Sequence, residues 1–402
     1  MLPNERSDRD EPTDAEPADA EPADAEPTDA EPADAEPADA EPTDAEPADA
    51  EPAGGGRLMP CGEYFTSYAD RMGLVRWRIE KVALVLAIPI PLLLPLLLGG
   101  GALSMVTRIF IFIIAVLGLH VILGYAGEIV LAQGAFMAIG AYASTRIVAE
   151  TGAGLIPGML VGGLLTAAVA VLFGLPSWRV KGFYIAISTL ALQFIALWFF
   201  ENNELAFIHG GSQQNIPRDV GLVGEYVTIS SATEQYFFVF AVMALFVLLT
   251  LNLSRTGIAR IFRGIHENDL SSAVLGIDVF RNKLLAYAIG GFMIGVAGSL
   301  YSLYIGFISP DYFTIELTLE HYVMLLLGGM GRVWGVVLGV SLVTIVQDEI
   351  RELLLTYAAD ATALEPLFFG VLIIVVLAVE PKGLLAGLGQ IKDYLRKWPY
   401  AY

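Results

Sequence analysis

The residues that could carry chemistry are few, and their spacing excludes the common kinds of catalytic site. The chain has one cysteine, Cys61, and four histidines scattered along its length, so neither a disulfide framework nor a metal site is expected. The phosphate-binding pattern G-x-x-x-x-G-K-[ST] does not occur, and Gly329, Gly331 and Gly335 have the wrong last spacing for a dinucleotide fingerprint. We therefore predict a non-enzymatic chain that binds no metal and no cofactor.

Polar side chains inside apolar stretches suggest a second kind of chemistry, the passage of a solute. Glu128 lies in such a stretch, where a carboxylate is costly and usually functional. His120 is expected to make a hydrogen bond between helices rather than to relay protons. Ion coupling through Glu128 stays open as an alternative. The residues predicted to shape a substrate pathway are Tyr125, Glu128, Gln133, Phe136, Gly329 and Gly331.

The loop 254–283 holds the most informative polar segment. Its stretch Arg263–Ile277 predicts one amphipathic helix, with Leu270, Ala273 and Val274 on an apolar stripe and Gly276 as the C-cap. An apolar stripe exposed to the cytosol favours docking into a groove on a partner protein. The acidic residues near the start of this helix disfavour a position flat on an anionic membrane surface.

These groups need elements to position them, and the composition indicates a membrane. Hydrophobic residues make up 55% of the chain, charged residues 16%, and the mean hydropathy is +0.61. We predict an all-α, polytopic transmembrane helix bundle of about 8–10 segments, each near the ~20 residues that cross a bilayer. The expected spans are Val82–Leu98, Leu103–Leu123, Ile129–Val148, Leu155–Leu175, Phe183–Phe200, Gln235–Leu253, Leu284–Ile305 and Leu364–Val379.

A further apolar region, His321–Val346, is interrupted by the glycine-rich stretch Gly328–Gly335. We predict a broken or re-entrant helix there, because unwound backbone at membrane depth is tolerated only where protein covers it or it lines a cavity. Elsewhere, glycines spaced by four residues predict close helix contacts. These are Gly154, Gly158 and Gly162, and Gly291 with Gly295.

Positive charges set the expected orientation. Most of the basic residues of the apolar body fall in 57–81, 254–283 and 382–397 or at Arg179 and Lys181, so we place these segments and both termini in the cytoplasm. Gly124–Gly127 must then be an inner turn, and the His321–Val346 region must return to the outer face.

The acidic character of the chain is confined to residues 1–56. They hold 20 acidic residues against two basic ones, which accounts for −18 of the net charge of −20. Residues 11–50 are eight copies of EPxDA, in which recurrent proline blocks helix formation and nothing apolar is available for burial. We predict a disordered acidic tail with a glycine linker, without an essential role in transport. An interaction arm is the alternative, and no nucleic-acid-binding face is expected.

The loop resembles the coupling segment of permease subunits of the branched-chain amino acid type of ABC importer, approximately A-I-R-E-N-E-x-A-A-x-x-x-G-I. His266 replaces a positive charge that is usual in the family. The matching residues are Ile265, Glu267, Asn268, Gly276 and Ile277.

Further blocks are similar to the same family and follow in its order from about residue 103 to 384. Gly124–Glu128 and the residues up to Tyr142 resemble G-Y-A-G-Q-L-S-L-G-H-A-A-F-F-G-I-G-A-Y, with Glu128 in place of Gln and Gln133 in place of His. The remaining blocks are Gly182–Ala191, Lys283–Tyr287, Ile308–Pro310, Leu327–Gly331 with Trp334 and Gly335, and Pro381–Leu384.

We divide the rest of the chain into a basic cytoplasmic lead-in over 57–81, a transmembrane permease domain over 82–384 that carries the coupling loop 254–283, and a cytoplasmic tail over 385–402. The resemblance implies a prokaryotic plasma membrane and, as partners, a second homologous permease, two cytosolic ABC ATPase subunits that use ATP and Mg, and an extracytoplasmic solute-binding protein. Residues implied in ATPase coupling are Arg263, His266, Glu267, Asn268, Asp269, Leu270, Gly276 and Ile277.

The implied substrates are branched-chain or related hydrophobic amino acids, with urea or short amides as alternatives within the family. An ion-coupled carrier or channel, and a membrane scaffold that uses the acidic tail, remain alternatives from other classes.

Overall fold

A computed structural model describes residues 91, 93–95, 99–175, 183–216, 220–222, 228–357, 370 and 374. The acidic tail, the basic lead-in, the C-terminal tail 385–402 and nearly all of the spans expected at 82–98 and 364–379 lie outside the described residues. So do Arg179, Lys181 and the block 381–384.

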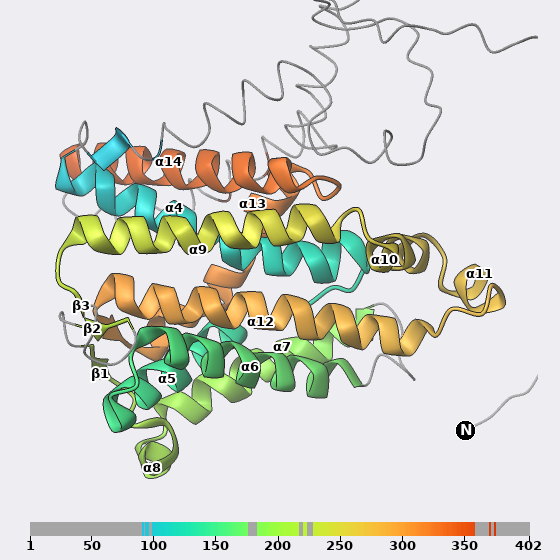
Figure 1. Cartoon of the computed structure of the whole chain (residues 1–402), viewed down its shortest axis with the longest axis horizontal. Coiled ribbons are helices and arrows are strands. Elements are labelled where there is room, and N and C mark those ends of the chain that lie inside the picture. The colour runs from blue at the N-terminus through green and yellow to red at the C-terminus, as the bar shows by residue number, and fades with distance from the viewer. Residues whose placement is uncertain are drawn as a thin grey trace, which may run out of the picture. The chain divides into compact units, whose positions relative to one another are not determined.

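The described part is built almost entirely of helices, which confirms the predicted all-α bundle (Figure 1). Its only strands are two antiparallel pairs of two-residue strands, β1 with β4 and β2 with β3. The elements are α4 (Gly100–Leu119), η1 (His120–Tyr125), α5 (Gln133–Thr151), α6 (Leu155–Gly174), α7 (Phe183–Glu201), η3 (Asn203–Leu205), α8 (Ala206–His209), β1 (Gln214–Asn215), β2 (Val220–Gly221), β3 (Thr228–Ile229), α9 (Ala232–Leu253), α10 (Gly257–Glu267), α11 (Asp269–Val274), α12 (Val279–Ile305), β4 (Phe307–Ile308), η4 (Pro310–Phe313), α13 (Ile315–Gly328) and α14 (Val333–Tyr357).

Six of the described helices are long and apolar enough to cross a membrane. The helix formed by α4 and η1 is central, since 83% of the residues in its most apolar stretch are buried within the chain. The corresponding share is 67% in α12 but only 33–39% in α6, α7, α9 and α14. The latter helices therefore surround the core and present apolar side chains outward.

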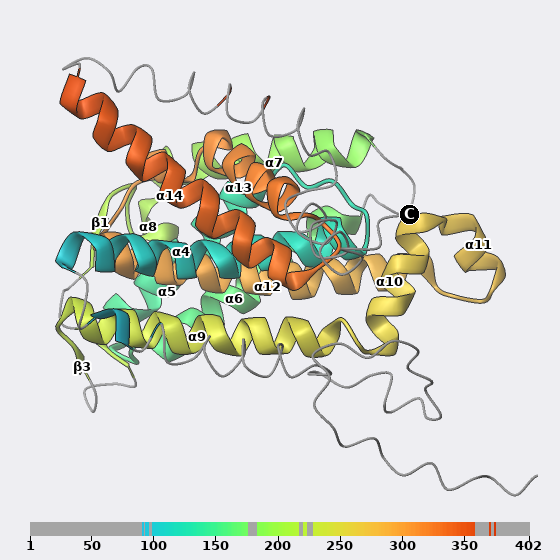
Figure 2. The same ribbon diagram turned by 90° about the horizontal axis from the view of Figure 1, so that it is seen from above.

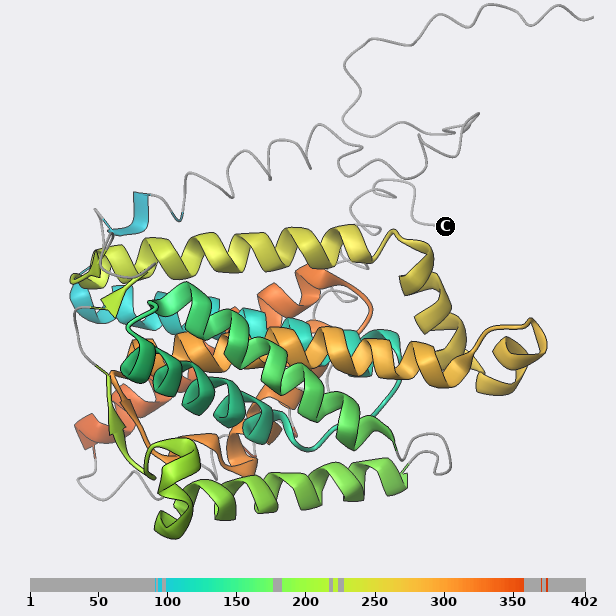
Figure 3. The same cartoon turned by 60° about the horizontal axis from the view of Figure 1, so that its bottom comes forward.

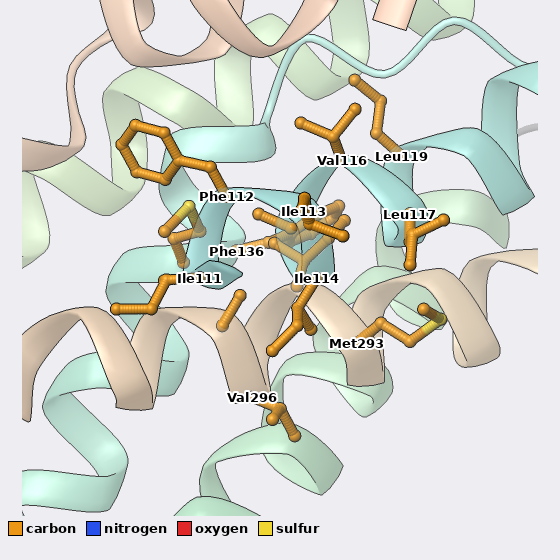
Figure 4. Packing of buried hydrophobic residues seen from close by; sticks show 14 of the residues in the cluster. Ile111, Phe112, Ile113, Ile114, Val116, Leu117, Leu119, Phe136, Met293 and Val296 are labelled. Carbon is orange, nitrogen blue, oxygen red and sulfur yellow. The ribbon is translucent and has the colours of Figure 1, made fainter. Parts of the chain in front are cut away.

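The core lies where α4, α5 and α12 meet (Figure 4). Branched and aromatic side chains of α4, among them Ile113 and Ile114, pack with Phe136 of α5 and with Met293 and Val296 of α12. Because α4 is apolar on nearly every face, protein can surround it without burying unpaired polar side chains.

Glycines allow the helices around this core to touch backbone to backbone. A Cβ atom added to Gly140 of α5 would collide with the backbone of Gly295 in α12, and one added to Gly162 of α6 would lie 2.6 Å from the Gly140 carbonyl oxygen. The expected contacts at Gly158, Gly162, Gly291 and Gly295 are confirmed. Gly154 differs, because it is the N-cap of α6 with φ of 93°.

Two predicted spans change their form in the structure. The span expected from Ile129 is helical only from Gln133, and residues 126–132 form a non-helical lead-in to α5. The interruption predicted within Gly328–Gly335 is present and shorter: α13 ends at Gly328, α14 begins at Val333, and the two helices pack together. Gly328 and Gly335 are in backbone contact and thus close a tight helical hairpin.

The hairpin returns the chain to the end of the bundle at which α4 begins. Asp348 of α14 forms an ion pair with Arg108, in the third turn of α4. With its 14 residues, α13 is only about 21 Å long, whereas α14 has 25 residues. The return is thus made by one short and one long helix.

We expect Gly140→Leu to destabilise the protein by more than the ~1–3 kcal/mol of ordinary overpacking, because backbone rather than a flexible side chain occupies the space. The midpoint of heat-induced aggregation of the detergent-solubilised protein measures this effect. Gly100→Leu is the matched control, since no atom lies within 4 Å of a Cβ added there. Equal midpoints for the two variants would contradict the packing argument.

Candidate functional site

The loop 254–283 forms two helices at one end of the bundle (Figures 1 and 2). The single helix predicted over Arg263–Ile277 is wrong, because the chain breaks at Asn268, which has extended backbone angles of −159° and 106°. Asn268 ends α10 and caps α11, its side chain accepting a hydrogen bond of 3.0 Å from the Ser271 amide. A short polar side chain that caps a helix makes a sharp corner there more stable than a continuous helix.

The short helix α11 carries an exposed apolar face. Leu270 is 72% exposed, Val274 81% and Leu275 80%. Gly276, with φ of 82°, ends the helix as expected: its amide donates to the Ala273 carbonyl, and the next amide donates to the Ser272 carbonyl. Large apolar side chains held this far out on a capped, fixed turn are typical of an interaction site.

Helix α10 attaches this projection to the bundle. Its inward face buries Ala259, Phe262 and Ile265. Arg263 lies over the ring of Tyr125, 5.2 Å from the centroid, and His266 packs against Gly127, where any side chain would meet the imidazole. Of the predicted coupling residues, His266, Glu267 and Asn268 are exposed and Ile277 is half-buried.

Lys283, in the second turn of α12, forms the strongest polar connection to α11. Its Nζ lies 2.6 Å from Glu128 Oε1 and 2.9 Å from Asp269 Oδ2, with the Lys283 and Glu128 side chains only 7% exposed. A cavity of about 350 Å³ adjoins these three groups and is lined also by His266, Glu267 and Asn268. Within the described part, this is the ion pair that joins the loop to the bundle core.

A second set of polar side chains contacts the non-helical lead-in at residues 126–132. Tyr322 of α13 exchanges two hydrogen bonds of 2.8 Å with the backbone of Val130, and Thr189 of α7 accepts from the Leu131 amide at 2.9 Å. The polar side chains of α7 and α13 therefore replace the hydrogen bonds that a helix would have made here.

The start of α5 is capped in the same way. The Gly134 amide donates to Thr318 at 2.9 Å, and the Ala135 amide donates to Gln193 at 2.8 Å. Gln193 also donates to the Phe313 carbonyl at 2.6 Å, which ties the cap to η4. Because these amides already have partners, they are not available to bind the carboxylate of a solute.

This cap lies deep within the bundle. Gln133 donates from Nε2 to the carbonyl of Ala115 at 3.0 Å, and Ala115 precedes the end of η1 by ten residues, or about 15 Å of helix. Gln133 Oε1 is buried and has no hydrogen-bond partner among the described residues. An unpaired amide oxygen at such depth is costly.

The structure does not bring the predicted pathway residues into one cluster. Tyr125 packs with Arg263 and His120, Glu128 pairs with Lys283, and Gln133 bonds to α4. Phe136 is fully buried in the core, and Gly329 and Gly331 lie in the turn between α13 and α14, whose Met330 carbonyl is close to Gly124.

His120 does not make the interhelical hydrogen bond that we expected. Neither of its ring nitrogens has a partner in the described part of the chain, and the ring meets Tyr125 edge-on with centroids 4.5 Å apart. It is an imidazole held by packing alone.

The sequence analysis missed the side chains that hold the lead-in, although a signal was present. Thr189 and Gln193, like Thr318 and Tyr322, are polar pairs spaced by four residues in apolar helices, so each pair lies on one helix face. These pairs bind backbone groups of the lead-in and of the start of α5, and a helix over the lead-in, as expected from the sequence, would have left its backbone groups no need of such partners.

The opposite end of the bundle holds a larger cavity of about 480 Å³. It lies between α5, the loop around β1, and the end of α12, and none of the described residues that line it is charged. Its polar lining consists of neutral side chains, namely Ser144, Thr145, Gln213, Gln214, Asn215 and Ser302.

Residues 101–377 match the family described as the branched-chain amino acid transport system permease component. The chain belongs to this family. The match includes every described helix from α5 to α14 and thus both polar groups above. The permease is accordingly a multi-pass membrane protein.

Curated relatives agree with this assignment. The permease is 29% identical over 327 residues to the high-affinity branched-chain amino acid transport system permease protein LivM of Escherichia coli, covering 76% of this chain and 75% of the relative. It is 31% identical over 239 residues to a probable LivM of Methanocaldococcus jannaschii, covering 58% and 68% of the two chains. It is also similar to E. coli LivH, with 26% identity over 284 residues that cover 67% and 89%. No solved structure matches the chain significantly.

We expect Thr318→Val to destabilise the permease by about 1–3 kcal/mol, because it leaves the Gly134 amide unpaired in an apolar surrounding. Thr318→Ser keeps the hydroxyl and should remain close to the wild type. The midpoint of heat-induced aggregation in detergent would compare the two. A serine variant as unstable as the valine variant would assign the effect to the lost methyl contact instead.

Proposed function

We propose that this permease is the membrane-spanning subunit of an ATP-driven importer for branched-chain or related hydrophobic amino acids. The observation that carries the proposal is the exposed apolar face of α11, mounted on a capped turn outside the bundle. Leu270 and Val274 are nearly as exposed as free side chains, which an isolated permease would have no reason to retain.

In this proposal α11 seats in a groove of a cytosolic ABC ATPase subunit. Leu270, Val274 and Leu275 fill the groove, and Glu267 lies at its rim together with His266. Asp269 faces the bundle, where it holds Lys283, so its role is to fix α11 rather than to contact the ATPase. ATP and Mg would be bound and used by the ATPase subunits.

The comparisons support a second permease as a partner. Two differently named permease proteins of the E. coli high-affinity branched-chain amino acid system are both similar to this chain. The outward-facing apolar side chains of α6, α7, α9 and α14 supply surface for a second permease as well as for lipid. A solute pathway between two such chains would be opened and closed as their ATPase subunits move.

The loop end of the bundle is cytoplasmic in this proposal. Arg255, Arg260, Arg263 and Arg281 lie there, as the positive-inside rule requires. The opposite end, with the strand pairs and the neutral cavity, would then receive solute from an extracytoplasmic binding protein. The described residues that line this cavity carry no charge, which suits zwitterionic or uncharged solutes. Such solutes include amino acids and, as the alternative within the family, urea or short amides.

Ion coupling is the competing function, and its candidate residue is Glu128. Its carboxylate is occupied by Lys283 at 2.6 Å. An acidic residue at such a site usually either has a partner or marks an ion pathway, and Glu128 has a partner. This pairing favours the ATP-driven importer.

The proposal predicts that Leu270→Glu separates the permease from its ATPase. Purification of the tagged chain from native membranes should recover stoichiometric ATPase subunits and a second permease with the wild type, but no ATPase with the variant. Phe207→Glu is the matched control, since Phe207 is also 72% exposed but lies in α8 at the opposite end of the bundle. A wild-type chain that is purified alone and transports without ATP would overturn the proposed function.

The left-handed conformation of Gly276 generates a second prediction. Gly276→Pro removes the amide that donates to Ala273 and demands a negative φ where the backbone has +82°. We expect uptake into cells to fall by about tenfold or more as α11 loses its shape, with normal amounts of permease in the membrane. Gly152→Pro imposes a similar local change at φ of +61° in the other end of the bundle, and it should retain the ATPase. Full uptake by the Gly276→Pro variant would remove α11 from the mechanism.

A further inference from the structure

Three charged groups from three separate segments meet at Lys283. Glu128 lies in the lead-in to α5, Asp269 in the first turn of α11, and Lys283 itself in α12. Each of the two carboxylates forms an ion pair with Lys283. Asp269 and Glu128 are therefore joined in series through one ammonium group.

The low exposure of these three side chains strengthens the ion pairs. Lys283 and Glu128 have side chains 7% exposed and Asp269 22%, so water screens the charges little. Without the ammonium group, two carboxylates would face each other in a half-closed cavity, and like charges at such a site repel. The charge of Lys283 hence stabilises the contact between the segments at Glu128 and Asp269.

The lead-in carries the connection from Glu128 into the membrane part of the bundle. At one end the Glu128 amide donates to the Ile122 carbonyl at 3.1 Å, and Gly127 packs against His266. Farther along, Val130, Leu131 and Gly134 are bound by Tyr322, Thr189 and Thr318. The backbone of the lead-in lacks the regular internal hydrogen bonds of a helix. A shift at Glu128 therefore changes these contacts to α7 and α13 before it changes the position of α5.

We propose that Lys283 is the positioning residue through which movement of α11 reaches the buried lead-in at 126–132 and the polar groups of α7 and α13. This inference rests on the proposed function, since it requires an ATPase that moves α11. The path runs from Asp269 through Lys283 to Glu128. It assigns Glu128 to energy coupling and not to contact with the solute.

The test measures the ratio of solute transported to ATP hydrolysed by the complete complex in proteoliposomes, for Asp269→Asn, Glu128→Gln and the double variant. Each single variant breaks one half of the series, so we expect each to lower the ratio by about tenfold while ATP hydrolysis continues. Because one broken connection already interrupts a series, the double variant should be no worse than the worse single variant.

Lys283→Met and Lys283→Arg complete the test. The methionine variant should lose coupling as the carboxylate variants do, and the arginine variant should retain most of it because a guanidinium group can bind both carboxylates. Arg281→Gln is the matched control, since Arg281 lies two residues before Lys283 in α12, has an 85% exposed side chain and pairs with the nearby Asp278. It should keep the wild-type ratio.

A merely structural role would give a different result. Transport and ATP hydrolysis would then fall together with the amount of assembled complex, and the effects of Asp269→Asn and Glu128→Gln would add. Either result overturns the inference. Failure of the wild-type chain to assemble with an ATPase would instead overturn the proposed function, so the two outcomes are distinguishable.

Discussion

The structure depends on one constraint, the need to pair every backbone amide and carbonyl that enters a hydrocarbon layer. Most of the described chain meets this need by forming helices. Residues 126–132 do not: Tyr322 of α13 and Thr189 of α7 pair the backbone of Val130 and Leu131, and Thr318 and Gln193 pair the first amides of the helix α5 that follows. This non-helical segment is tolerated within the bundle because α7 and α13 supply hydroxyl and amide groups to it.

Close glycine contacts give this arrangement a firm frame. Gly140, Gly162 and Gly295 bring α5, α6 and α12 into backbone contact, and Gly118 and Gly290 do the same for α4 and α12. Lipid supplies no hydrophobic force between helices, so such packing and short hydrogen bonds hold them together. The Ser299 hydroxyl, which donates to the Gly140 carbonyl at 3.0 Å, is one of these bonds. Figure 3 shows α10 and α11 projecting beyond one end of this frame. The hydrogen bond from Lys283 to Asp269 ties α11 back to α12.

The two ends of the bundle differ in chemistry in a way that suits directional transport. One end concentrates charge: Arg263, Glu128, Asp269 and Lys283 form pairs and stacking contacts around a projecting apolar face. The other end carries a cavity with neutral polar walls beside the strands β1 and β4. A charged, structured end suits contact with a partner that exerts force, and a neutral cavity suits entry of a zwitterion without a net charge to desolvate.

The sequence by itself determined the class of this protein. Stretches of about 20 apolar residues, glycines at four-residue spacing and the ordered blocks up to residue 384 are local patterns, and local patterns are sufficient to predict helices, close contacts and a family. They also located the glycine break before α14 and the C-terminal end of α11 at Gly276, because a left-handed turn limits the choice of residue strongly. What only the tertiary structure decided is where the helices stop and which polar groups meet. Ile129 to Ala132 are as apolar as a helix interior, but they are not helical. Thr189 and Tyr322, about 60 and 190 residues away in the chain, offer this backbone hydrogen bonds in place of helical ones. Glu128 likewise reads as an isolated membrane carboxylate until α12 brings Lys283 to it, since an ion pair between distant segments leaves no periodic trace in the sequence.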